Sequence, residues 1–449
     1  MPLAGSGALS SAATGPLAEC LGSAGHMGQI LNSPRSILRN TAVLTTGAAG
    51  AKMIGFLAIP VITRIYAPSD LGALSVFASL AMILAPMATL RYEVAIPLPR
   101  NQGLAVNLAL GCLLTLGLMS SLLAVAIWAW GDVVLKAMSM EVLLPYRALL
   151  VVMVFITGYS AIVTHWAVRE SAFRPMAAAR LWQAVSGSLV KIGLGLLGWK
   201  PSGLLLGETV GQAGGVVYLS SRFWRHFLSR ITSVRRRYLA FLMKRYASFP
   251  KYRVPSQVLL AFSNKAPLLF SASLFGADTT GQLSLAMMAL ALPVSLIGQA
   301  AGQALYSEVT KIGRRNRTEI YSAARAVTWS MGLASILPAL FLLFLSPALF
   351  SWLFGPEWRE AGVFCSILAI YLVAQFVSAP IMNILNVYDR QAQFLLFNAM
   401  RSLLVIAVFG AARYMGWDAL KTLVVYSISM AALYAYLARN IFRIIRGHA

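Results

Sequence analysis

Apolar residues in this chain come in runs of about 20, the length that an α-helix needs to cross a hydrocarbon core about 30 Å thick. The runs lack the roughly ten-residue alternating segments of outer-membrane strands. Only 11% of the residues are charged, against roughly 25% in soluble domains. These features exclude a soluble globule and predict an all-α, polytopic membrane protein.

The apolar runs predict about twelve transmembrane helices. Their predicted ranges are 42–63, 71–90, 104–127, 148–167, 178–199, 203–221, 254–275, 281–304, 327–350, 361–384, 393–412 and 419–438. One long connection, 222–253, divides them six and six. We therefore expect two six-helix lobes, an N-lobe over 41–221 and a C-lobe over 254–438, with terminal tails at 1–40 and 439–449.

The first 40 residues are rich in Ala, Gly and Ser and contain no basic segment followed by an apolar core. They do not resemble a cleaved secretory signal, and we expect a disordered tail. Met27 is an alternative start to Met1, because the first basic residues follow it.

The basic residues, which give a net charge of +23, are divided unevenly between the two predicted sides. The side shared by both termini carries 26 basic and six acidic residues, and the opposite side carries seven of each. The positive-inside rule then predicts that both termini lie in the cytoplasm.

The linker 222–253 holds ten of the basic residues. Apolar residues recur every three or four positions on its other face: Phe223, Phe227, Ile231, Val234, Tyr238 and Leu242. This pattern favours a helix held on anionic lipid headgroups. A site for a nucleic acid or a regulatory protein is the less favoured alternative.

A short internal repeat links the two halves. The segment Tyr66–Ser75 (YAPSDLGALS) aligns without gaps on Phe275–Ser284 (FGADTTGQLS), and each joins the first two predicted helices of its half. Six helices return the chain to its starting side. The halves are therefore predicted to be parallel repeats about an axis along the membrane normal.

Arg180 and Lys421 lie near the ends of their predicted helices and are counted with the residues at the membrane faces. Five charged residues remain inside predicted helices: Lys52, Lys191, Lys265, Arg401 and Glu208. Each costs about 2.5–3.5 kcal/mol in a membrane unless it faces a partner or a hydrated cavity. Four bases share a single acid. The sequence therefore predicts a polar, cationic interior suited to an anionic substrate.

Lys52 and Lys265 are the principal candidates for anion binding, because each is central in the first helix of its half. Under the repeat alignment they are offset by one helical turn, so we expect them on similar faces of a central cavity. For Lys191 and Arg401, snorkelling or a local hydrogen bond is the alternative to substrate binding. Glu208 is a candidate for ion coupling or for a static pair with a base.

Motifs for chemistry are missing. The chain has no GxxxxGK[ST] loop, no GxSxG and no large outer loop for an acceptor site, so we expect neither an enzyme nor a cofactor. The three cysteines and four histidines are isolated, so no metal site is expected.

Five segments resemble the Wzx-like polysaccharide flippases of the multidrug, oligosaccharidyl-lipid and polysaccharide exporter superfamily. They are Asn40–Gly72 (NTAVLTTGAAGAKMIGFLAIPVITRIYAPSDLG), Ala88–Pro99 (ATLRYEVAIPLP), Phe249–Ser256 (FPKYRVPS), Ala291–Glu308 (ALPVSLIGQAAGQALYSE) and Phe354–Gly362 (FGPEWREAG). The resemblance runs from about Asn40 to the C-terminus, so the preceding tail departs from the family pattern.

The resemblance implies movement of undecaprenyl-pyrophosphate-linked oligosaccharide across the bacterial inner membrane, for O-antigen, lipopolysaccharide or exopolysaccharide synthesis. It also implies alternating access, with Lys52 and Lys265 in a cationic lumen and Arg91 as a gate or entry residue. A periplasmic-side polysaccharide polymerase is a candidate partner. The main alternative is a multidrug-type small-molecule exporter of the same superfamily, in which we would expect an acidic cavity.

Overall fold

The computed structural model describes residues 34–99, 101–228, 236–313, 316–388 and 390–447, and the secondary structure within these ranges is entirely helical. The helices of the N-half are α2 (Pro34–Ile65), α3 (Pro68–Thr89), α4 (Gln102–Ala137), α5 (Arg147–Arg169), α6 (Phe173–Leu196) and α7 (Ser202–Leu228). A connecting helix, α8 (Arg236–Arg245), precedes the C-half. The helices of the C-half are α9 (Val254–Pro293), α10 (Gln299–Ile312), α11 (Arg317–Phe354), α12 (Arg359–Ser378), α13 (Ile384–Val387), α14 (Gln391–Met415) and α15 (Ala419–Arg446).

Local sequence signals set several helix boundaries. The side chain of Asn101 accepts a hydrogen bond from the backbone of Gly103 at 2.7 Å and caps the start of α4. Asp418 caps α15 in the same way, through the backbone N–H of Lys421 at 3.1 Å. Helix α14 is followed by Gly416 as its C-terminal cap, and the φ of +64° there suits a residue without a Cβ.

Nine segments of the described chain are long and apolar enough to cross a membrane. One of them, Phe249–Pro293, contains the bend at Gly276 and therefore supplies two of the predicted crossings. Helices α6 and α7 are 24 and 27 residues long but less apolar, because they carry Arg180, Lys191 and Glu208. Together these helices account for the predicted polytopic, all-helical fold.

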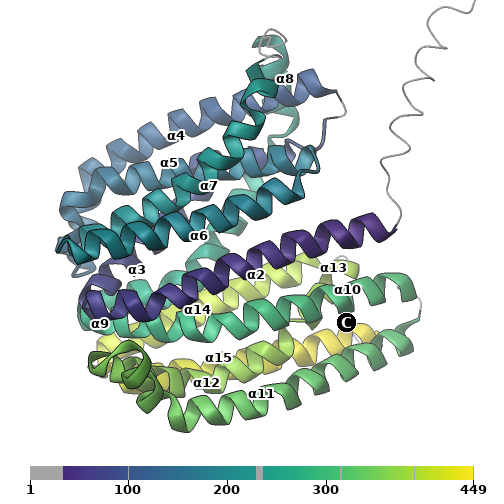
Figure 1. The fold of residues 1–449 in the computed structure, drawn as a ribbon. Helices are drawn as coiled ribbons and strands as arrows, with labels where there is room; N and C mark the ends of the chain where they lie inside the picture. Colours follow the sequence, from purple (N-terminus) through teal and green to yellow (C-terminus); the bar gives the residue numbers. More distant parts are fainter. Residues whose placement is uncertain (1–33, 100, 229–235, 314–315, 389, 448–449) are drawn as a thin grey trace, which may run out of the picture.

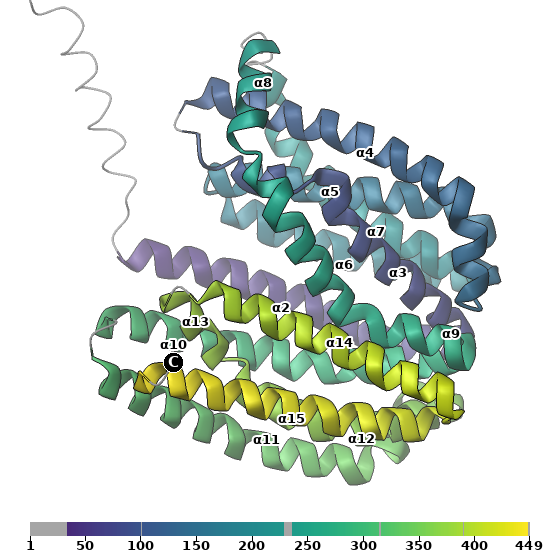
Figure 2. The same cartoon turned by 180° about the vertical axis from the view of Figure 1, so that it is seen from behind.

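Helix α9 contains two parts that run in opposite directions. They meet at Gly276, where φ is +81° and ψ is −177°, a conformation open to glycine but costly for other residues. Figure 2 shows the chain running from α8 to the bend near the α9 label and returning as α10. Between Pro293 and α10 the backbone forms a π-helical turn, Val294–Gly298.

The two ends of the helical bundle differ. At one end, which we call the far end, the chain turns between α2 and α3, at Gly276 and between α11 and α12. The opposite end, the terminal end, holds the start of α2 and the C-terminus (Figure 1). Helices α4–α7 lie on one side of the bundle and α11–α15 on the other, while α3 packs against α9 between them.

Hydrogen bonds join the two halves at the far end. The indole N–H of Trp358, which is buried, donates to the carbonyl oxygen of Thr63 at 2.9 Å. The hydroxyl of Ser273 donates to the carbonyl oxygen of Ala137 at 3.0 Å. These contacts close the bundle at the far end.

The residues of the internal repeat meet their own equivalents at this closure. The hydroxyls of Ser75 and Ser284, which occupy matching repeat positions, are 2.5 Å apart. Gly72 and Gly281 also match, and a Cβ on Gly281 would lie 3.0 Å from the backbone nitrogen of Gly72. Contact between equivalent residues is what a two-fold axis produces. The repeat therefore lies on a pseudo-two-fold axis between the halves.

The described part of the linker packs on the N-half. Leu242 of α8 is 2% exposed, and the hydroxyl of Tyr92 donates to the carbonyl oxygen of Met243 at 3.3 Å. Tyr238 and Phe241 remain exposed. Of the predicted apolar face of the linker, the side chain of Phe227 and the whole of Ile231 and Val234 lie outside what the structure describes.

Candidate functional site

Two adjoining cavities lie between the helices. The first, of about 820 Å³, is lined by α2, α3, α6, α7, α9 and α10, and we call it the N-half cavity. Three of its lining residues are cations, Lys52, Arg180 and Lys191, and one is an acid, Glu208. Lys52 and Arg180 are exposed to this space and interact electrostatically with each other.

Glycines let α6 and α7 approach closely along the N-half cavity. A Cβ on Gly211 would lie 2.9 Å from the Cα of Gly187, and a Cβ on Gly207 would lie 2.9 Å from the backbone nitrogen of Lys191. Such an approach is possible only without side chains at these positions. The longer polar residues on the same faces are thereby placed beside the cavity.

Lys191 and Glu208 form an ion pair across this helix contact. The ammonium and carboxylate groups are 2.5 Å apart, and their side chains are 17% and 34% exposed. Breaking such a pair would leave one charge without compensation in a membrane interior. Glu208 thus offsets the charge of Lys191, and the remaining cations of the N-half cavity are Lys52 and Arg180.

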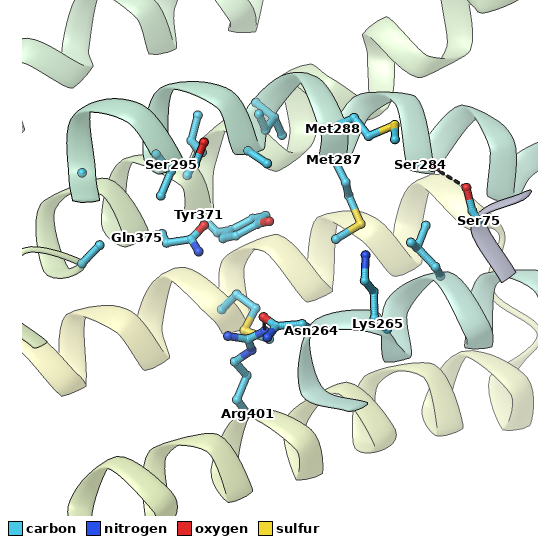
Figure 3. A pocket seen from close by; sticks show the side chains of 18 of the residues that line it. Ser75, Asn264, Lys265, Ser284, Met287, Met288, Ser295, Tyr371, Gln375 and Arg401 are labelled. Atoms are coloured by element: carbon cyan, nitrogen blue, oxygen red, sulfur yellow. Dashed lines mark hydrogen bonds between the residues drawn. The ribbon is translucent and has the colours of Figure 1, made fainter. Parts of the chain in front are cut away.

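The second cavity, of about 630 Å³, is lined mainly by α9, with further residues from α3, α12, α14 and α15, and we call it the C-half cavity. Figure 3 shows Lys265, Asn264 and Arg401 together on one side and Tyr371 and Gln375 on another. The guanidinium of Arg401 donates a hydrogen bond to the side-chain oxygen of Asn264. Lys265 and Arg401 are both partly exposed to this space.

Glu208 lies where the two cavities meet, because it lines both of them together with Ser295 and Gln299. Lys265 interacts electrostatically with Glu208. Lys52 and Lys265 therefore line adjoining cavities on either side of this carboxylate. The described lining of the two cavities contains five cations and one acid, an excess of four positive charges.

Arg91 lies outside the lining of both cavities. It sits in the turn after α3 with φ of +58°, and its guanidinium is 3.2 Å from the carboxylate of Glu93, whose side chain is fully buried. Neither oxygen of that carboxylate makes a hydrogen bond of good geometry. The turn contacts the linker through Tyr92 and Met243. The structure thus places Arg91 at the terminal end, beside the connection between the halves.

Burial raises the pKa of Glu93, although Arg91 and His165 act in the opposite direction. A carboxyl whose pKa is raised on folding stabilises the fold at low pH, and this stabilisation is lost as pH rises through the folded-state pKa. Glu93→Gln removes this loss of stability, because the glutamine side chain stays uncharged at high pH. We expect the variant to melt above the wild type at about pH 8, with a smaller difference at about pH 5. Tryptophan fluorescence in detergent measures both curves; a difference independent of pH would contradict this assignment.

Sequence reasoning missed Arg180, which was counted with the residues outside the membrane. Helix α6 begins at Phe173, so Arg180 lies two turns inside the helix. The signal was present in its spacing, because Arg180, Gln183, Gly187 and Lys191 follow one another at three or four residues and share a face. The polar residues of the C-half cavity, such as Tyr371 and Gln375, gave no comparable signal.

In the part of the chain that the structure describes, no three His, Cys, Asp or Glu residues form a group that could hold a metal. The two described cysteines, Cys112 and Cys365, are buried and unbridged. Charge and polarity in the cavities are supplied by lysines, arginines, Glu208, amides, serines and tyrosines.

The fold is similar to those of known transporters. The lipid II flippase MurJ in an inward closed conformation matches with a TM-score of 0.69 and 11% identity, covering 90% of each chain. An inward-facing multidrug resistance MATE family transporter matches with a TM-score of 0.60 and 16% identity, covering 90% of this chain and 94% of the transporter. Its outward-facing counterpart matches with a TM-score of 0.58 and 14% identity, covering 91% and 95%.

No curated protein matches this chain significantly in sequence. The family model described as "Polysaccharide biosynthesis protein" matches residues 107–363, more than half of the chain. The multidrug transporters and the lipid II flippase share the fold of this chain. The resemblance seen in the sequence is thereby confirmed, and the chain belongs to the polysaccharide biosynthesis protein family.

Proposed function

We propose that this protein is a flippase that moves undecaprenyl-pyrophosphate-linked oligosaccharide from the inner to the outer leaflet of the bacterial inner membrane. The observation that carries the proposal is the pair of adjoining cavities with an excess of four positive charges. The negative charge of a pyrophosphate would compensate much of this excess. The family match to polysaccharide biosynthesis proteins supports the same substrate class.

The size of the cavities also suits a lipid-linked sugar. Each volume alone falls in the range of about 300–1,000 Å³ that holds a drug-sized ligand, and the two spaces adjoin at Glu208. In this proposal the diphosphate and sugars pass through the cavities while the polyprenyl chain stays in lipid. The protein transports the substrate unaltered, by alternating access.

The charge distribution supports an orientation. The terminal end holds most of the basic residues, so we place it and both termini in the cytoplasm, with the far end in the periplasm. Hydrogen bonds at the far end, such as Trp358 to Thr63, then close the periplasmic side in this state. The basic linker would lie near anionic lipids of the inner leaflet, and a periplasmic polymerase would receive the product.

The competing function is the export of small organic cations. The fold similarity to MATE transporters favours it. The cavity chemistry opposes it, because five cations face one acid, Glu208, which is already paired with Lys191. Like charges would repel a cationic drug from both cavities.

The test is leaflet accessibility in liposomes. The purified protein is reconstituted with a labelled undecaprenyl-pyrophosphate oligosaccharide, and an externally added glycosidase reports the accessible fraction over time. We expect protein-dependent exposure of the whole lipid pool, against about half in protein-free liposomes. No gain over protein-free liposomes, together with efflux of an organic cation by the same preparation, would replace the flippase by the small-molecule exporter.

A further inference from the structure

We propose that the two cavities divide the substrate between them: the diphosphate binds in the N-half cavity at Lys52 and Arg180, and the glycan binds in the C-half cavity against Tyr371, Gln375 and Asn264. This inference rests on the flippase function proposed above. It assigns the two chemical parts of the substrate to different halves of the protein.

The N-half cavity has the features of an anion site. Lys52 and Arg180 interact electrostatically with each other, and neither forms an ion pair with an acid in the described part of the chain. Two adjacent cations repel each other unless an anion lies between them. Phe56 is the one aromatic residue in the described lining, and glycines and alanines leave room for a phosphate to approach.

The C-half cavity is chemically different, because three tyrosines belong to its polar lining, whereas amides line both cavities. Tyr371, Tyr426 and Tyr434 all line it, and the rings of Tyr371 and Tyr426 pack edge to face at 5.9 Å. Phe409 and Phe397 brace two of these rings from behind. The result is a group of aromatic rings held in fixed positions, of which Tyr371 keeps the largest exposed fraction, 9%, for contact with the apolar face of a sugar ring.

The amides supply hydrogen bonding of the kind that sugars need. Asn264, Gln375 and Asn383 line the same cavity, and each side chain can both donate and accept. Sugar hydroxyls also do both, whereas a lysine only donates. Figure 3 shows Gln375 beside the ring of Tyr371, with Asn264 on the opposite side of the space. A hydroxylated ligand between them would find partners on both sides.

The cations of the C-half cavity are less available to a diphosphate. Arg401 donates a hydrogen bond to Asn264, and Lys265 interacts with the carboxylate of Glu208. Glu208 itself stands at the junction, where it pairs with Lys191 and interacts with Lys265, so this part of the lining offers a phosphate no cation without an acidic partner. The same carboxylate can accept a hydrogen bond from a sugar hydroxyl. The junction thus favours the glycan on one side and the diphosphate on the other.

The experiment compares two lipids on purified protein in nanodiscs: bare undecaprenyl pyrophosphate, and the lipid-linked repeat unit extracted from the source cells. Gln375→Leu should weaken binding of the glycosylated lipid about tenfold and leave the bare lipid unchanged, because an unpaired sugar hydroxyl is costly. Lys52→Gln combined with Arg180→Gln should weaken both lipids by the same factor. Asn383→Leu provides a second glycan-side variant if Gln375→Leu does not fold.

Gln212→Leu is the matched control, because it makes the same chemical change in the N-half cavity. It should not alter the ratio of the two affinities. The division is overturned if Gln375→Leu and Asn383→Leu weaken both lipids equally or neither, or if the wild type binds both lipids with the same affinity. Failure of the wild type to bind either lipid would instead overturn the flippase function itself.

Discussion

Replacing Lys52 and Lys265 together by alanine is expected to reduce lipid flipping about 100-fold, close to the protein-free background. The change removes one cation from each cavity and halves the excess of four positive charges in the lining. A charge-assisted hydrogen bond is worth about 1.5–3 kcal/mol, and about 1.4 kcal/mol corresponds to a factor of ten. The liposome assay measures the initial rate directly.

Two further pairs of variants separate charge from packing at these positions. Arginine at both sites keeps the charge and should retain most of the activity, whereas glutamate at both sites should be worse than alanine. All variants should insert into the membrane to the wild-type level, which a fluorescent fusion can quantify. Normal flipping by the double alanine variant, or equal loss with alanine and glutamate, would show that the positive charge is not what the substrate needs.

Gly281→Ala is expected to open the far end and to stop transport. A Cβ at this position would lie 2.6 Å from the carbonyl carbon of Pro68 and 3.0 Å from the backbone nitrogen of Gly72. Backbone atoms cannot yield as a flexible side chain can, so α3 and α9 must separate. Overpacking of this kind costs about 1–3 kcal/mol, enough to shift a conformational equilibrium about tenfold or more.

A cysteine introduced by Gln299→Cys reports the shift, because Gln299 lines both cavities. A membrane-impermeant maleimide added at the far end should label this cysteine about tenfold faster when Gly281→Ala is also present. The native cysteines should not contribute to the labelling, because Cys112 and Cys365 are buried and Cys20 is replaced by serine. Gly117→Ala is the control, since a Cβ there meets nothing within 4 Å. Equal labelling in the Gly281→Ala and Gly117→Ala backgrounds would rule out a role for this glycine contact in closure.

The membrane-spanning architecture could be predicted from the sequence because its cause is local. A helix must cover the hydrocarbon core with apolar side chains, and capping residues such as Asn101 and Asp418 mark where that run begins. The internal repeat also predicted which residues of the two halves are equivalent. It paired Gly72 with Gly281 and Ser75 with Ser284, and the structure brings these same residues into contact.

The candidate site could be predicted only in part. Intramembrane charge is rare, so Lys52, Lys191, Lys265, Arg401 and Glu208 could be singled out, and all five line the two cavities. Their partners could not be predicted, because the pairing of Lys191 with Glu208 depends on how closely glycines let α6 and α7 approach. Uncharged lining residues such as Gln375 resemble any other polar residue in a helix until the fold is known.

The π-helical turn at Val294–Gly298 has a consequence for the helix that follows it. Such a turn holds one residue more than an α-helical turn, and one residue corresponds to a rotation of about 100° around the helix axis. The extra residue therefore decides which side chains of α10 point toward the cavities. Gln299 faces the cavities. Gly302 lies so close to Pro380 and Asn383 that a Cβ would be 2.9 Å from the amide nitrogen of Asn383. Deleting one residue from this turn would rotate every side chain of α10 to a new face while leaving its amino-acid composition untouched.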